Sequence, residues 1–95
     1  MGDKDFIKIA KDAVVNYFND RVEKIDKNCR ISEDGVFVVW MCKTLQNNKA
    51  LLSTIVCDGM YYEITFNGDK KELYLDAYKK WENKVLFYTD EKERS

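Results

Sequence analysis

The sequence predicts a single α+β domain in which an N-terminal helix covers an antiparallel sheet. Two observations predict this class. Apolar residues recur with a helical period at the start of the chain, and apolar runs in the middle are separated by short polar turns. A chain of 95 residues is long enough for one core. We therefore expect one domain over residues 1–95, with 1–2 and 90–95 frayed, in the order helix, three- or four-stranded β-meander, helix.

The first segment is predicted to be an amphipathic helix with one apolar stripe. Asp3 is expected to cap its N-terminus, and Asp5 places negative charge in the first turn. A single stripe needs one surface to cover, which the sheet would provide. The residues that follow the 3.6-residue period are Phe6, Ile9, Ala10, Ala13, Val14, Tyr17, Phe18, Val22 and Ile25.

The stretch from Val36 to Leu75 predicts the meander. We place two-residue hairpin turns at Asn47-Asn48 and Asp58-Gly59, because Asn and Asp-Gly favour such turns. In this register Ser53 is the only polar residue on the helix-facing side of the first three strands. The apolar residues predicted on that side are Val38, Trp40, Cys42, Leu51, Ile55, Cys57, Met60, Tyr62, Ile64 and Phe66.

The segment after Phe66 has two interpretations. In the first, 67–70 is a hairpin loop, a fourth strand carries Leu73 and Leu75, and Asp76 caps a final helix. In the second, Asp69 begins the helix directly. We favour the fourth strand because Asn-Gly is a strong hairpin signal. Either helix would carry Ala77, Tyr78 and Trp81 on its apolar side.

The second face of the predicted sheet is too apolar for a face in water. Either the final helix covers it, or it binds another protein or a second copy of the chain as a homodimer. We place any recognition here. The candidate protein-binding residues are Phe37, Val39, Met41, Val56 and Tyr61.

Composition argues against catalysis and metal binding. The chain has no His, which removes the commonest general base and most zinc sites. Its three Cys form no C-x-x-C pair, and Asp58 and Glu63 do not form an acid–base pair. We predict a protein that is not an enzyme and has no cofactor and no metal. Without a long apolar segment or a signal peptide, we expect it in the cytoplasm and not in a membrane.

A basic and aromatic cluster near the C-terminus supports an alternative function. Lysines that hold phosphate and aromatic rings that stack on a base would bind a nucleic acid or a nucleotide. The same aromatics also fit the buried side of a helix, and the net charge of −1 gives no overall basic field. The cluster consists of Lys70, Lys71, Tyr78, Lys79, Lys80, Trp81 and Lys84.

Nearly the whole chain resembles a family of small uncharacterised phage and prophage proteins of Gram-positive bacteria. The segments VVWMCKTLQNNKALLST and DGMYYEITFNGDKKELYLDAYKKWEN resemble it, as does FIKIAKDAVVNYFND at the start. The resemblance implies an accessory role in the cytoplasm of the host cell and no known activity. We therefore expect a non-enzymatic accessory protein that acts by protein–protein binding, in host takeover or anti-defence.

Overall fold

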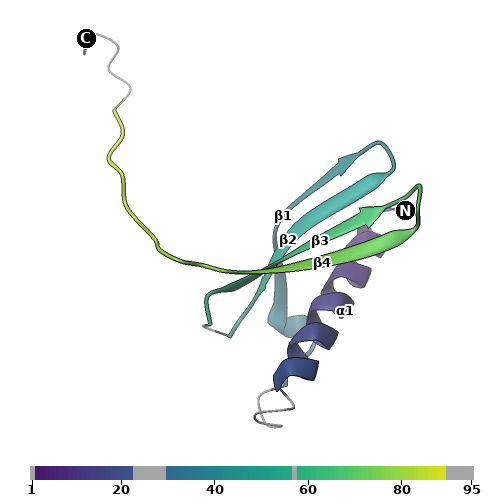
Figure 1. Ribbon diagram of the computed structural model, residues 1–95, viewed down its shortest axis with the longest axis horizontal. Helices are drawn as coiled ribbons and strands as arrows, with labels where there is room; N and C mark the ends of the chain where they lie inside the picture. The colour runs from purple at the N-terminus through teal and green to yellow at the C-terminus, as the bar shows by residue number, and fades with distance from the viewer. Residues whose placement is uncertain (1, 23–29, 57, 90–95) are drawn as a thin grey trace.

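In the part of the chain that the structure describes, the protein forms one α-helix and one four-stranded antiparallel sheet. The structure is a computed structural model that describes residues 2–22, 30–56 and 58–89. Helix α1 crosses one face of the sheet, whose strand order is β1-β2-β3-β4 (Figure 1). The predicted α+β class is confirmed. The elements are α1 (Asp3–Val22), the 3-10 turn η2 (Glu33–Gly35), β1 (Val36–Thr44), β2 (Asn47–Thr54), β3 (Met60–Asn67) and β4 (Glu72–Lys79).

Helix α1 packs on the sheet through the predicted stripe. Phe6, Ala10, Val14 and Phe18 are buried at four-residue spacing, which keeps them on one face of the helix. The helix begins at Asp3, and the backbone N–H of Phe6 donates to the Gly2 carbonyl at 3.0 Å. The cap is therefore one residue earlier than predicted. Ile25, the last residue of the predicted stripe, lies outside the described residues.

The first hairpin turns two residues earlier than predicted. Its turn is Leu45-Gln46, because Thr44 pairs with Asn47, and Leu45 adopts the left-handed conformation at φ 57°. The register also shifts between Val38 and Trp40, which pair with Leu52 and Leu51. Val39 is thus the extra residue of a β-bulge, and beyond it the side chains of β1 exchange faces.

The pairing register of the second hairpin differs from the predicted register by an odd number of residues. Leu52, not Ile55, pairs with Tyr62, so β2 turns its other face toward the helix. The prediction for β3 is right, since Met60, Tyr62, Ile64 and Phe66 all pack in the core or against it. The prediction is wrong for Trp40, Cys42 and Leu51, which lie on the opposite face, and for Ile55, which follows β2. Cys57 lies outside the described residues.

The fourth strand is confirmed. Asn67 pairs with Glu72 around the loop Gly68–Lys71, one residue later than the predicted loop, and Leu75 pairs with Ile64. The side chain of Asn67 organises this loop by accepting hydrogen bonds from the backbone N–H groups of Asp69 and Lys70, each at 3.1 Å.

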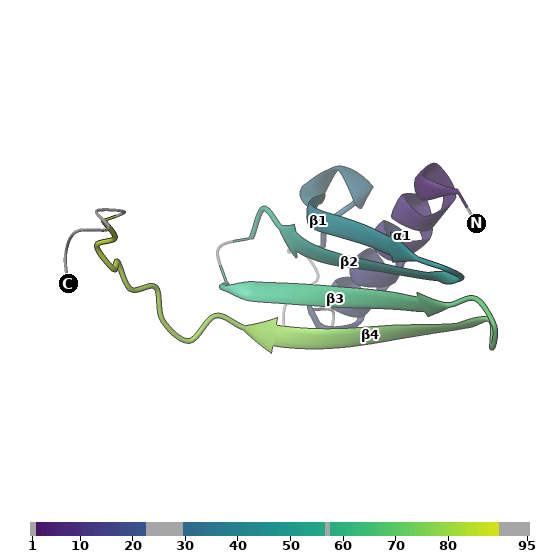
Figure 2. The same cartoon turned by 90° about the horizontal axis from the view of Figure 1, so that it is seen from above.

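The predicted C-terminal helix is wrong. Asp76, its expected cap, lies inside β4 opposite Glu63, and residues 80–89 have no regular secondary structure. Tyr74 and Tyr78 favour a strand, which is consistent with β4 running through the proposed helix start. We call residues 80–89 the tail. It leaves the sheet at the end of β4 and runs away from it (Figures 1 and 2).

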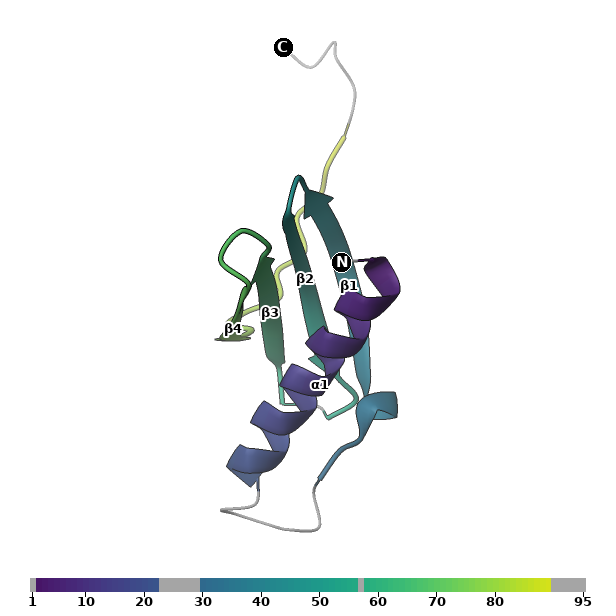
Figure 3. The ribbon, with the colours of Figure 1, turned by 90° about the vertical axis from the view of Figure 1, so that its right-hand side faces the viewer.

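The core lies between α1 and one face of the sheet, which we call the helix side (Figure 3). Asn19 ties the end of α1 to the chain entering β1. Its amide donates to the Ile31 carbonyl at 2.9 Å and accepts from the Ile31 N–H at 2.8 Å. The fully buried core residues are Phe6, Ala10, Val14, Val36, Ala50, Leu52, Tyr62 and Ile64.

Candidate binding surface

The opposite face of the sheet, which we call the outer face, is the candidate site. Side chains alternate along each strand, so this face collects the residues between those of the helix side. Within the described residues no helix packs on it (Figures 2 and 3). The outer face consists of Phe37, Trp40, Leu51, Tyr61, Tyr74 and Tyr78 as its apolar and aromatic part, and of Cys42, Thr44, Asn47, Lys49, Ser53, Glu63, Thr65, Asn67, Glu72 and Asp76 as its polar part.

The strand register arranges these residues in rows across the sheet. One row runs from Phe37 through Ser53 and Tyr61 to Tyr78. Ser53 is nearly buried in this row, and its hydroxyl donates to the Met60 carbonyl at 2.9 Å, so it presents little polarity. Phe37 is 47 % exposed and Tyr78 is 52 % exposed. The row therefore forms an aromatic ridge open to a partner.

The neighbouring row adds Trp40 and an ion pair. Trp40 is 43 % exposed and pairs with Leu51, which in turn pairs with Glu63. The Glu63 carboxylate lies 3.5 Å from the Lys49 ammonium. The outer face thus combines one charged pair with large aromatics, and aromatic residues are enriched at the buried centres of protein interfaces.

The electrostatics of this face are acidic along β4. The Tyr78 hydroxyl donates to Glu63 at 3.4 Å, and the negative charges of Glu63 and then Asp76 raise the pKa of Tyr78 above its usual value. Tyr74 donates to Glu72, and this hydrogen bond raises the pKa of Tyr74. Both phenols therefore stay neutral hydrogen-bonding groups at physiological pH.

The structure divides the five predicted protein-binding residues among different places. Phe37 and Tyr61 lie on the outer face. Val39 is exposed in the bulge, and Val56 follows the end of β2. Met41 lies on the helix side, packed against the core, because the bulge reverses the alternation of β1.

Sequence reasoning missed Trp40, Leu51, Tyr74 and Tyr78 as members of the outer face. The prediction places Trp40 in the core because no sequence signal marks the bulge at Val39. It places Leu51 there because the predicted register of the second hairpin differs from the observed one by an odd number of residues. Tyr78 was assigned to a helix. No local signal marks Leu45-Gln46 as a turn, since it contains no Gly, Asn or Asp. For the exposed aromatics of β4, the one sequence signal is that Tyr favours strands over helices.

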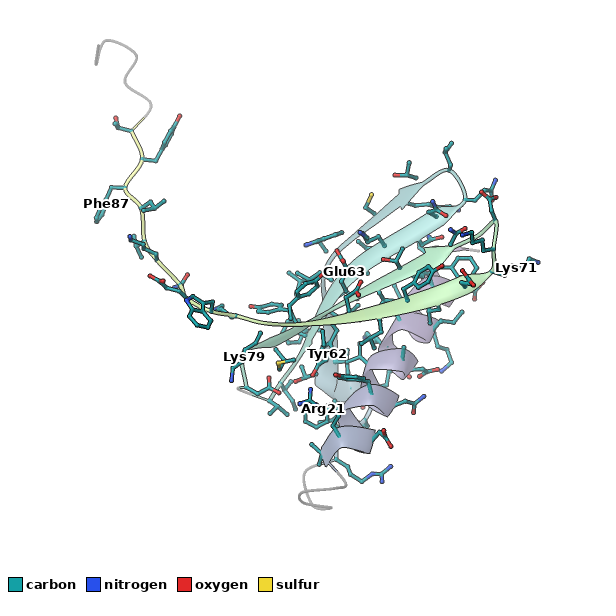
Figure 4. The ribbon with its side chains drawn as sticks, viewed as in Figure 1. Arg21, Tyr62, Glu63, Lys71, Lys79 and Phe87 are labelled. Atoms are coloured by element: carbon teal, nitrogen blue, oxygen red, sulfur yellow. The ribbon has the colours of Figure 1, made fainter. Side chains whose placement is uncertain are left out.

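The predicted basic cluster is not brought together. Lys70 and Lys71 lie in the loop before β4, whereas Lys79 and Lys80 lie at its far end (Figure 4). An extended strand of this length separates Lys71 from Lys79 by roughly 26 Å. Lys84 and Trp81 lie farther along the tail, and Tyr78 belongs to the outer face. The arrangement does not form one phosphate-binding patch.

A small pocket of about 280 Å³ lies on the helix side near the end of α1. Burial, and then the charge of Asp58, raises the pKa of Tyr62, which points toward the helix near Arg21 (Figure 4). No group of metal-ligating side chains occurs within 2–22, 30–56 and 58–89. In the same ranges, no helix is sufficiently long and apolar to cross a membrane. The described residues lining the pocket are Phe18, Arg21, Val22, Asp58, Met60, Tyr62 and Lys79.

Comparison with known proteins identifies a family but no characterised relative. No curated protein matches the chain, and no solved structure matches it. A family model described as "Family of unknown function (DUF6275)" matches residues 7–88, which include most of α1, the whole sheet and most of the tail. The protein therefore belongs to this family of unknown function, DUF6275.

Proposed function

We propose that this protein is a small non-enzymatic accessory protein of a phage or prophage of a Gram-positive bacterium. It binds another protein through the outer face, in host takeover or anti-defence, in the cytoplasm of the host cell. The phage setting rests on the sequence resemblance described above. The observation that supports binding is the uncovered row of Phe37, Tyr61 and Tyr78 beside Trp40. Trp and Tyr are enriched among the few residues that carry most of the binding energy of protein interfaces.

The outer face fits a protein better than a nucleic acid. Its charged groups are Lys49, Glu63, Glu72 and Asp76, so it has no excess of positive charge to neutralise phosphates. Its aromatics are joined by strand pairing into a continuous surface, which gives a partner apolar area and a few oriented hydroxyl groups.

The test is Trp40→Glu in the full chain. A partner is captured from lysogenic or infected cells, purified, and titrated against the wild type and the variant by calorimetry. We expect Trp40→Glu to weaken binding by about 30-fold or more, which is typical for the loss of an interface hot spot.

The matched control is Lys4→Glu, which introduces the same side chain on the solvent-exposed side of α1, away from the outer face. It should bind as the wild type does. Equal binding of Trp40→Glu and wild type, with both folded by circular dichroism, would show that the outer face is not the binding surface.

A further inference from the structure

The tail carries apolar side chains that nothing in the described residues covers. Trp81 is 96 % exposed and Phe87 is 99 % exposed, and the tail points away from the sheet (Figure 4). Val85, Leu86 and Tyr88 are also largely exposed. Such a segment is costly in water. The family match runs through residue 88, so this segment belongs to the domain that the family shares.

Strand β4 lies at the edge of the sheet and has unpaired backbone groups along its outer side. The N–H of Lys80 donates to Gly59 at 2.7 Å, so even-numbered residues of this strand direct their N–H and C=O groups toward β3. Backbone groups alternate along a strand, and the odd-numbered residues therefore direct theirs outward. Those residues are Leu73, Leu75, Ala77 and Lys79.

We propose that the tails of two copies are exchanged, each adding as a fifth strand to β4 of the other copy. The tail segment 81–88 is as long as β4, which has 8 residues. It continues β4 outward in the structure and contains no Gly or Pro that would turn it back onto its own strand. Exchange around a two-fold axis lets both tails pair at once, which closes the assembly as a dimer.

Backbone geometry restricts how the tail pairs. Two antiparallel residues exchange hydrogen bonds only if both direct their backbone groups to the shared edge. Odd-numbered tail residues must then face odd-numbered residues of β4. This places Trp81, Val85 and Phe87 on the helix side, where Leu73 is partly exposed and Leu75 packs against the core.

Two registers satisfy this rule with complementary side chains. With residue 80 on the two-fold axis, Lys84 faces Asp76 and Phe87 faces Leu73 of the second copy. With residue 81 on the axis, Lys80 faces Glu82 and Phe87 faces Leu75 of the second copy. In both, opposite charges and apolar pairs are matched across the strands, which stabilises a sheet.

The experiment compares Val85→Pro with Lys84→Pro in the full chain. Proline removes a backbone N–H, which the pairing uses at position 85 but directs to solvent at position 84. Light scattering over a concentration series should show a dimer for the wild type and for Lys84→Pro. Val85→Pro should raise the concentration at half-dissociation by at least about tenfold. A monomeric wild type, or equal effects of the two prolines, would overturn the proposal.

A second measurement needs no substitution. In the dimer, the backbone N–H groups of Val85 and Phe87 should exchange slowly with deuterium, and those of Lys84 and Leu86 quickly. Uniformly fast exchange along the tail at dimer concentrations would overturn strand exchange.

The inference does not depend on the proposed function, because Trp40→Glu should leave this dimer intact. Loss of the dimer in Trp40→Glu would instead identify the outer face as the self-association surface and overturn the tail exchange.

Discussion

At the scale of single residues, the core is assembled from a few side chains of contrasting size. Ala10 on α1 and Ala50 on β2 are both fully buried, which lets the helix approach the sheet closely. Tyr62 fills the space beside them, with its ring 5.8 Å from that of Tyr17 in an edge-to-face arrangement. The contribution of a strand residue to stability therefore depends on whether its side chain faces this core or the opposite face of the sheet.

Leu51 and Leu52 provide a direct test of this difference. Leu52 is fully buried beneath α1, whereas Leu51 lies on the outer face. We expect Leu52→Ala to lower the free energy of unfolding by about 2–5 kcal/mol, because it leaves a cavity in the core. Leu51→Ala should cost about 1 kcal/mol or less. Urea unfolding of both variants measures this, and equal losses would contradict the assigned register.

Tyr62 should make stability depend on alkaline pH. Burial and the charge of Asp58 raise its pKa in the folded state, so the unfolded chain loses the phenolic proton first. Its contribution is fully present below the unfolded pKa of about 10 and is lost as pH rises through the folded pKa. Urea unfolding at about pH 9 and about pH 11 should show a smaller fall in stability for Tyr62→Phe than for the wild type.

The same experiment in high salt separates the contributions of Tyr62 and Tyr78 to the pH dependence of stability. The pKa of Tyr78 is raised first by the charge of Glu63, and the interaction of such exposed groups is screened by salt. The difference between Tyr62→Phe and wild type should persist in salt, because burial is its main cause. Its disappearance would show that Asp58, not burial, dominates.

At the scale of elements, the two hairpin ends support one another. Gly68, in the loop before β4, lies against the Gln46 carbonyl in the β1–β2 turn, and its N–H donates to the Asn47 side chain at 3.3 Å. This contact gives Asn47 a role at the start of β2 rather than in a turn. Asn47-Asn48 is therefore not the turn of the first hairpin. Asn47 instead links the two hairpins through this hydrogen bond.

Gly68→Ala should disturb this link. An added Cβ would overlap the Gln46 carbonyl, so we expect a loss of about 1–3 kcal/mol with shifted amide resonances at Leu45 and Gln46. Gly59→Ala is the control, since an added Cβ at Gly59 would meet Lys80 only at an ordinary contact distance of 4.0 Å, while its φ is positive at 73°. It should cost about 1–2 kcal/mol from backbone strain and leave the Leu45 and Gln46 resonances unchanged.

At the scale of the whole molecule, the fold was more predictable than the surface. Helical and strand periods are local, so the class, the order of α1 and the strands, and the helix-side residues of β3 could be predicted from the sequence. Registers depend on Leu45-Gln46 and on the bulge at Val39, which have no local signal. The outer face was therefore assigned correctly at Phe37 and Tyr61 and wrongly at Met41.

The tail determines the shape of the molecule. The Cα radius of gyration is 16.9 Å, whereas a compact chain of this length has about 12 Å. The sequence predicts a helix here because the spacing of Tyr78 and Trp81 would place both side chains on one side of a helix, where they could pack on the sheet. Sequence periodicity cannot distinguish a segment that packs on its own sheet from one that leaves it.

The bulge in β1 makes the two borders of the sheet unequal. β4 is regular over its full length, whereas the pairing of β1 is interrupted at Val39. A sheet with two flat borders can add copies at both sides and grow into a fibre. With one border distorted, growth at β1 is hindered. The bulge therefore makes the β1 border a poorer template for a further strand than the regular β4 border.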